Sequence, residues 1–498
     1  MEDGPVAWTL LAILISAFLY KRFLVFTRDV PEEYLNEQSI IDSTRNQDES
    51  AIHKSTKLDY SSGLRVGLGI RYAHYKLRNG NLYDIWEIAM GHVKKNQSKS
   101  IFFDHIPVKL SLLNGLASQF QSIILELSKS EVIDEICIHT NLLFTDPEVL
   151  AVIIACFTFQ ITVHIHDGSH KTSAESSSVH LKKHLGDIFL IRGTKNLVNL
   201  KTKVDKNQEK TDFENEYTFE KDRGIAVRIS HQVNHRAVVC TDFTQSNLVS
   251  SVASCIKHLP PQHQMTSSDR MLLVQDKSSI EGVANTLVKI LVTLVTGTEL
   301  YISSNLATGI EHRPTIISAE NEVVQKLAKE PKGIDKLLQL HRLYSLSCNR
   351  FSALIFNKPY PDLRLVIAHR SITSAQESPD WRKIRASLVT QVVEEIGYFN
   401  VAGPLIVSDL FDYRKFASGV SSQTLTHGAV AQSNEIKLVE FDGKNSGKLS
   451  VRGYNIGKAK TIMENVGETL ILPDTEGFYQ LPVRARWGSD GCIYVMKQ

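Results

Sequence analysis

The hydrophobic pattern of the chain begins with an uncharged apolar run, Val6–Tyr20, which is followed by Lys21 and Arg22. A membrane-spanning helix needs about 17–25 residues. The segment reaches this length when it is counted over residues 5–26, with the two basic side chains extending to the membrane surface. The pattern therefore predicts one N-terminal membrane helix and a membrane anchor over residues 1–28.

The residues on either side of the apolar run indicate whether the segment is cleaved off and how it is oriented in the membrane. Glu2 and Asp3 precede it, whereas a cleaved signal peptide carries a basic region there, so we expect the segment to be retained. Lys21, Arg22 and Arg28 follow it, and the positive-inside rule then places the body in the cytosol. We expect a single-pass protein of the endoplasmic reticulum or a lipid droplet. Because the run is short, monotopic or hairpin insertion stays open as an alternative.

Beyond the anchor, residues 29–62 are polar and weakly patterned, which is typical of a juxtamembrane linker. Helical and strand-like apolar periodicities then alternate over residues 63–428, and this alternation favours a parallel α/β body. Residues 201–223 are dense in charge and predict an exposed loop. The expected helices are Leu110–Leu127, Pro147–Phe157, Ile280–Val295 and Ser387–Ile396, and the expected strands are Val132–His139, Gln160–His166, Ile225–Ser230, Ala237–Cys240 and Glu299–Ile302.

The last part of the chain, residues 429–498, has short alternating apolar stretches separated by glycine turns. This pattern predicts a small β-rich subdomain. The expected fold class is therefore α/β, with parallel-sheet layers, a β-rich C-terminal subdomain and one N-terminal membrane helix.

Composition and charge narrow the function classes. The formal net charge is only +2, which gives the whole molecule no strong attraction to nucleic acid. The six cysteines are scattered and include no C-x-x-C pair, so we expect no disulfide framework and a reducing compartment. The sequence also lacks G-x-S-x-G, G-x-x-x-x-G-K-[ST] and G-x-G-x-x-G motifs, which removes the usual signatures of serine hydrolases and nucleotide-binding loops.

Several short motifs, in their order along residues 105–498, resemble the adenylate-forming superfamily, the acyl-CoA synthetases and their relatives. Residues 447–453 (GKLSVRG) are similar to the family's G-E-L-x-V-x-G, and Gly477-Phe478 and Asp490-Gly491 are similar to a paired hairpin near the end of its large domain. Residues 114–166, Ser246-Asn247-Leu248 and residues 267–270 (SSDR) carry the rest of the likeness. The resemblance implies the adenylate-forming large domain as the fold of the body.

Such enzymes handle ATP with four elements, and the sequence departs from all of them. A Gly/Ser/Thr loop wraps the phosphates, but residues 230–238 read SHQVNHRAV, and no glycine occurs from Ile225 to Glu281. The family's Y-G-x-T-E, whose glutamate holds Mg²⁺, is matched to residues 402–406 (AGPLI), and its ribose-binding T-G-D to residues 481–483 (LPV). The sequence ends at Gln498, about where the family's hinge begins, so the domain with the adenylation lysine is expected to be absent.

These departures predict a vestigial pocket without chemistry. We expect no catalytic residue and no cofactor; ATP, Mg²⁺ and CoA would enter only if the chain were a divergent active ligase. The residues expected to line the vestigial pocket are Ser230, Arg236, Ala402, Gly403, Pro404, Ile406 and Val483.

Two histidine groups are candidate binding sites. His164, His166, Asp167 and His170 could ligate zinc, but a polar strand end is favoured because no cysteine or glutamate stands nearby in the sequence, so no metal site is assigned. His231, His235 and Arg236 could hold an anion, but a plain loop is favoured.

The sequence therefore favours a non-catalytic, membrane-anchored relative of acyl-CoA synthetases that acts as a scaffold or ligand sensor in lipid metabolism. Its expected partners are the membrane, other proteins and an acyl or nucleotide ligand, but not nucleic acid. Two alternatives stay open: a divergent active ligase that needs a partner domain, and a protein-interaction module whose pocket has collapsed.

Overall fold

A computed structural model gives the structure of most of the chain. It describes residues 4–58, 63–129, 132–168, 178–184, 187–192, 195–199, 204–213, 217–234, 236–328, 331–351, 358–414, 423–442, 446–463 and 467–497.

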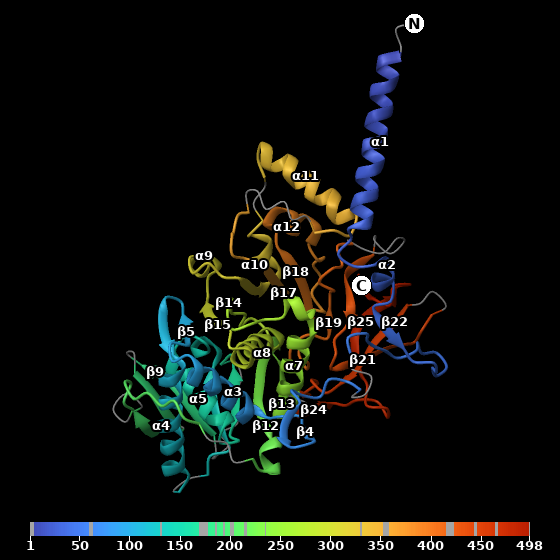
Figure 1. Ribbon diagram of the computed structural model, residues 1–498. Helices are drawn as coiled ribbons and strands as arrows, with labels where there is room; N and C mark the ends of the chain where they lie inside the picture. The colour runs from blue at the N-terminus through green and yellow to red at the C-terminus, as the bar shows by residue number, and fades with distance from the viewer. Residues whose placement is uncertain are drawn as a thin grey trace.

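The N-terminal apolar segment forms the helix α1 (Gly4–Phe26), which projects away from the body (Figure 1). Val6–Phe26 has a mean hydropathy of 1.8, and only 6% of its most apolar window is buried. By length and composition it is long and apolar enough to cross a membrane. Its last turn meets the body, where Leu24 is 1% exposed.

A sheet of fifteen strands forms the larger layer of the body. Six of its strands are parallel, as the helix–strand alternation predicted, and helices α8 (Ile280–Thr296), α9 (Leu306–Ile310), α10 (Asn321–Gln325), α11 (Ile334–Ser347) and α12 (Trp381–Leu388) lie between them in sequence. In spatial order the parallel strands are β18 (Gln391–Gly397), β17 (Leu365–Ser371), β16 (Ile316–Glu320), β14 (Arg270–Val274), β15 (Glu299–Ser303) and β5 (Ser100–Phe103).

A second sheet of nine strands lies beside the first layer in the lower part of Figure 1. Its centre pairs β9 (Ser178–His184), β7 (Glu135–His139), β8 (Thr162–His166) and β12 (Ile225–Asn234) in parallel, and β13 (Ala237–Thr244) returns antiparallel to β12. The outer strands are β10 (Asp187–Arg192), β11 (Lys195–Asn199), β23 (Lys458–Met463) and β24 (Gly467–Ile471).

Helices between and around the sheets supply most of the apolar core. The main core cluster draws on α3 (Leu82–Lys95), α4 (Leu110–Ser128), α5 (Pro147–Phe157), α7 (Gln245–His258) and α8. Eleven residues with Pro147 at the first position form α5, as the proline and the apolar run predicted.

The C-terminal residues form the expected β-rich part, and the predicted linker joins it. Strand β2 (His53–Ser55) pairs with β21 (Asn434–Val439), and β1 (Ser39–Ile41) extends the same sheet. Lys57 lies 2.7 Å from Asp409 in an ion pair. Residues 32–58 are therefore part of the folded body, in contrast to the predicted linker. The remaining strands here are β19 (Ile406–Val407), β20 (Thr424–Val430), β22 (Ser446–Gly453), β25 (Tyr479–Trp487) and β26 (Ile493–Met496).

One predicted helix is wrong. The expected helix over Ser387–Ile396 is the end of α12 followed by strand β18. Val389 has a φ of 52°, which ends the helix in the left-handed region. The segment Gln391–Gly397 lies between β17 and β19 and is buried on both faces. Its sequence therefore does not alternate between apolar and polar residues, as that of a half-exposed strand does.

Candidate functional site

The main candidate site is a cavity of about 200 Å³ at the carboxyl ends of β14, β16, β17 and β18. Ligands of open parallel sheets bind outside the carboxyl ends of the strands, so the fold itself places a site here. Each strand delivers polar residues at or just beyond its end. The lining residues include Asp276, Glu281, Asn285, Glu320, Asn321, Glu322, His369, Arg370, Ser374, Glu377, Glu395, Gly397, Gly403 and Pro404.

The lining of this cavity is rich in acid. Six of the lining residues are aspartate or glutamate, against one arginine and one histidine. Burial first, and then the charge of Asp276, raise the pKa of Glu320. Burial opposes ionisation of Asp276, but His369 and Ser278 outweigh it and lower the pKa of that carboxyl. The lining therefore holds more acidic than basic side chains.

The single arginine of the lining, Arg370, is hydrogen-bonded to other residues of the protein. Arg370 is 7% exposed, and its guanidinium donates to the carbonyl oxygens of Ser374 at 2.8 Å and Gln376 at 2.6 Å. It also donates to the Ser378 hydroxyl at 3.2 Å. These bonds hold the loop after β17 in place, so few of its donors are left to neutralise an anionic ligand.

Glu395 is held from behind by a buried lysine. Lys289 on α8 is fully buried, and its ammonium donates to Glu395 Oε1 at 2.5 Å. Burial opposes the charge on Lys289, but Cys255 and Glu395 outweigh it and raise the pKa of this ammonium. The second carboxylate oxygen, Oε2, has no hydrogen-bond partner within the protein.

Several other buried polar atoms on this cavity also lack partners. Asn285 is 7% exposed and both its amide oxygen and nitrogen are without hydrogen bonds. His369 is 6% exposed; its Nε2 lies 3.6 Å from Asp276, but neither ring nitrogen makes a hydrogen bond. The amide oxygen of Asn321 is likewise unpaired. Buried polar groups are normally satisfied, so these atoms indicate a place for water or a polar ligand.

The structure brings part of the predicted pocket together here. Gly403 and Pro404 line the cavity, and Ala402 and Ile406 are fully buried beside them. Gly403 has a φ of 70°, and a Cβ at this position would lie 2.2 Å from Ser251 Oγ, so glycine is required for this turn.

Val483 lies on a second cavity, of about 470 Å³, with Pro482, Leu425 and Val495. The two cavities share Ser374, so they are neighbours.

The other two predicted pocket residues lie elsewhere. Ser230 is on β12 and Arg236 is exposed on the turn to β13, and neither lines either cavity. Asn234 pairs with Ala237 in this hairpin, within the stretch of sequence that is matched to the family's phosphate loop. His235 and His170 lie outside the described residues.

The aspartate and glutamate residues that line the strand-end cavity were not predicted from the sequence. Asp276, Glu320 and Glu395 are spread over residues 276–395 and meet only through the parallel sheet. The available signal was a polar residue at the end of each buried apolar strand, as in LLVQD, IISAE and VVEEIG.

Comparisons with known proteins agree with this architecture. The crystal structure of VinN superposes with a TM-score of 0.57 at 12% identity, covering 87% of this chain and 99% of that one. The N-terminal domain of FACL13 from Mycobacterium tuberculosis gives a TM-score of 0.54 at 10% identity, covering 83% and 99%. A long-chain-fatty-acid-CoA ligase, FadD1 from Archaeoglobus fulgidus, gives 0.53 at 12% identity, covering 87% of each chain.

The chain has the fold of the adenylate-forming acyl-CoA synthetases. In sequence it is 24% identical to the uncharacterized protein YHR045W of Saccharomyces cerevisiae, over 98% of both chains. No protein-family model matches the sequence.

On this adenylate-forming fold, the residues present do not fit ATP and Mg²⁺. A two-residue hairpin connection offers no loop of closely spaced amides for two phosphate groups. The strand-end cavity adds carboxylates without free cations among its described lining residues, and like charges repel the triphosphate. Carboxylate oxygens could bind a cation such as Mg²⁺. The described lining residues, however, offer no group that would bind the phosphates of ATP.

Proposed function

We propose that this protein is a membrane-anchored relative of acyl-CoA synthetases that does not form adenylates. In this proposal the strand-end cavity serves as a binding site for a cationic or hydrogen-bond-donating ligand, and the protein acts as a sensor or scaffold at the endoplasmic reticulum or a lipid droplet. The observation that carries it is the combination of an open cavity, an acidic lining and a hairpin in place of the phosphate loop.

The electrostatic argument supports the loss of adenylation. Adenylation brings a triphosphate to the site and needs positive groups where charge develops. Here Arg370 is engaged with its own loop and Lys289 is paired with Glu395. The unpaired oxygens of Asn285, Asn321 and Glu395 are acceptors, so they match a ligand that donates hydrogen bonds.

A second surface supports the membrane assignment. Helix α11 lies close to the base of α1 in Figure 1, and Tyr20 of α1 stacks on Tyr344 with ring centroids 6.2 Å apart. The outward side of α11 is apolar: Ile334, Leu337 and Leu340 are 74%, 68% and 54% exposed.

These apolar positions recur at helical spacing, so they share one face of α11. Arg342, Ser345 and Leu346 are buried on the opposite face. A helix in water shows its polar side outward, and an apolar outward stripe beside an apolar helix is typical of a surface that lies in a lipid interface. We therefore infer that α1 spans or enters the bilayer and that α11 rests on it.

The proposal is tested with the full chain in lipid nanodiscs. We expect no ATP–pyrophosphate exchange with fatty acids, and no thermal stabilisation by ATP–Mg²⁺, because a ligand that binds the folded state must raise its stability. We expect stabilisation by amine-bearing ligands in a small-molecule screen, and its loss in the Asn285→Ala variant.

Exchange activity by the chain alone would refute the proposal and favour a divergent ligase. Restoration of exchange by a co-purifying partner would favour a ligase that needs a second chain. Thermal stabilisation by ATP–Mg²⁺ but not by amines would contradict the assigned charge preference of the cavity.

A further inference from the structure

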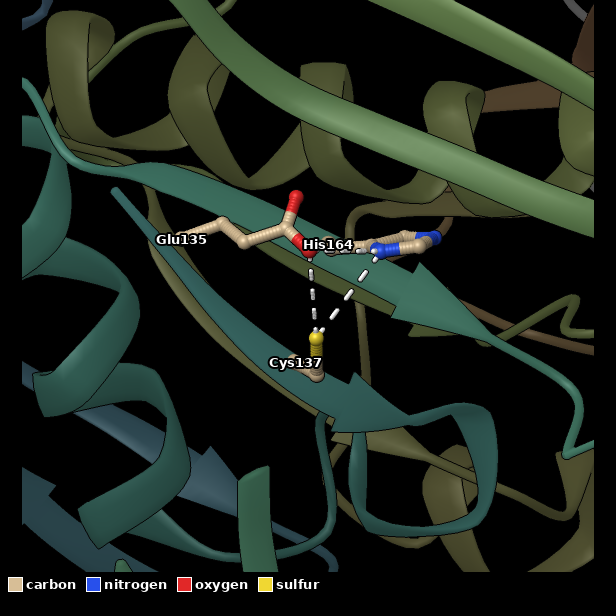
Figure 2. Close-up of side chains that lie close together, drawn as sticks. All are labelled: Glu135, Cys137 and His164. Carbon is tan, nitrogen blue, oxygen red and sulfur yellow. Dashed lines mark hydrogen bonds and ion pairs between the residues drawn. The ribbon is translucent and has the colours of Figure 1, made fainter. Parts of the chain in front are cut away.

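A separate cluster of metal-ligating side chains lies in the nine-stranded sheet, away from the strand-end cavity. Glu135 and Cys137 stand on β7, and His164 stands on the neighbouring parallel strand β8, in register with Cys137. Figure 2 shows the three side chains pointing toward one another. All three are buried, and Cys137 is fully inaccessible.

The strand pleat explains why these three residues meet. Successive side chains on a strand point to opposite faces, so Glu135 and Cys137 share one face of β7. The intervening Ile136 and the next residue Ile138 belong to the main apolar core, as do Val163 and Ile165 on β8. The polar residues are therefore gathered on the other face.

The distances within the cluster match those between ligands of one metal ion. Cys137 Sγ lies 3.7 Å from Glu135 Oε1 and 3.8 Å from His164 Nδ1, and Nδ1 lies 3.5 Å from Oε1. A nitrogen–oxygen separation of 3.5 Å is too long for a good hydrogen bond. Ligands at about 2.0–2.3 Å from a tetrahedral zinc stand about 3.3–3.7 Å from one another.

The surrounding hydrogen bonds orient the ligand atoms. Ser230 Oγ lies 2.8 Å from His164 Nε2, so with a proton on Nε2 the lone pair of Nδ1 faces Cys137. Ser178 donates to Glu135 Oε1 at 2.8 Å, and Arg228 donates to Oε2 at 2.9 Å. Partners of this kind hold metal ligands in place.

The charge state of the cluster also suits a cation. The guanidinium of Arg228 lies 2.9 Å from Glu135 Oε2 in an ion pair, and a neighbouring positive charge favours the charged form of a carboxyl group. The carboxylate is therefore ionised at neutral pH. Binding of a divalent metal would release the thiol proton of Cys137 to solvent, which leaves two anionic ligands to balance the ion.

We propose that Glu135, Cys137 and His164 bind a divalent transition-metal ion, with zinc as the best match to one thiolate, one imidazole and one carboxylate. The fourth position would be taken by water, because the group of ligand atoms that lie within 4.8 Å of one another comprises Glu135, Cys137 and His164. The ion would fasten β7 to β8. This proposal does not depend on the function proposed for the strand-end cavity.

The sequence-based prediction of no metal at this place considered only residues near His164 in the sequence. His164 has both a cysteine and a glutamate beside it, but they come from residues 135 and 137, one strand away. His166, the second predicted ligand, lies further along β8, with its ring centroid 5.9 Å from that of His164.

The test uses the full-length protein, purified in detergent after removal of any affinity tag, and measures bound metal by mass spectrometry. We expect about one zinc per chain after growth with zinc. Titration of the metal-free protein with Co²⁺ should give a thiolate-to-cobalt charge-transfer band. If the wild-type protein shows neither zinc binding nor the cobalt band, the proposal is overturned.

Variants assign the ion to this cluster. Cys137→Ala should abolish the cobalt band, whereas Cys156→Ala, which removes another fully buried thiol on α5, should keep it. Because Cys137→Ala could unfold, Glu135→Gln serves as a second variant; we expect it to weaken zinc binding by about tenfold or more. An unchanged cobalt band in both Cys137→Ala and Glu135→Gln would overturn the assignment.

Discussion

At the scale of single residues, the ion pair between Lys289 and Glu395 positions one of the acidic side chains of the strand-end cavity. Lys289 is fully buried on α8 and meets one oxygen of Glu395, while the other oxygen lies on the cavity without a partner. A buried ion pair adds little stability compared with apolar residues, but one half left alone is costly. The pair therefore fixes Glu395 with one carboxylate oxygen on Lys289 and the other at the cavity.

This pairing predicts a non-additive response to substitution. Lys289→Met leaves Glu395 buried without its partner, and we expect it to destabilise the protein by about 3 kcal/mol. The double variant Lys289→Met/Glu395→Gln removes both charges and should recover most of that loss in thermal unfolding. A double variant no more stable than Lys289→Met would show that the two residues are not coupled.

Residue chemistry was only partly predictable from the sequence. Gly403 and Pro404 could be assigned to a pocket because a glycine–proline turn is visible as a motif. Glu135, Cys137 and His164 could not be grouped, because 27 residues separate Cys137 from His164 and only strand pairing joins them. The same reason hid Asp276, which meets Glu395 through the parallel sheet.

At the scale of elements, sequence patterns predicted an element correctly where its start and its type are both marked locally in the sequence. The α5 helix was predicted with its bounds because its proline and apolar run are both local signals. Strand β18 was mistaken for helix because it is buried on both faces, so its sequence shows no alternation. The segment with β1 and β2 was taken for a linker because its strands have three residues each and gain stability only from β21.

The outward face of α11 gives a prediction at this scale. A polarity-sensitive fluorophore attached through Leu337→Cys should report an apolar environment for the full chain in nanodiscs and an aqueous one, in detergent-free buffer, for the chain that lacks residues 1–19. The same probe at Asp335→Cys, on another side of the helix, should report water in both. Both variants carry Cys348→Ser, because the other native cysteines are buried. Identical spectra at the two positions in nanodiscs would exclude contact between this face and lipid.

At the scale of the whole molecule, α1 has an exposed part and a part that packs against the body. Residues up to about Leu19 are exposed, whereas Leu24 is buried in the body and Arg350 lies 5.0 Å above the ring of Phe23. Deletion of residues 1–19 should therefore abolish carbonate-resistant membrane association and leave the melting temperature unchanged. Deletion of residues 1–28 should also destabilise the body, by about 2 kcal/mol for the lost burial of Leu24. Equal melting temperatures for the two deletions would contradict this division.

The buried histidines make the stability of the whole body depend on pH. His53 on β2 stacks on Trp487 with ring centroids 3.4 Å apart, and burial, opposed by the charge of Asp42, lowers the pKa of His53 to about 4. Burial likewise lowers the pKa of His258 to about 3. These imidazoles are neutral in the folded state, while in the unfolded chain they bind a proton near pH 6.5.

Between about pH 6.5 and pH 4 the unfolded state therefore binds more protons, and stability falls as the pH falls through this window. At pH 5 the loss is about 2 kcal/mol for each such histidine, since each pH unit below 6.5 contributes about 1.4 kcal/mol. His53→Phe keeps an aromatic ring against Trp487 but cannot be protonated, so its melting temperature should decline less between pH 7 and pH 5 than that of the wild type. Parallel pH profiles for the two proteins would contradict a lowered pKa of His53, which lies where β2 joins β21.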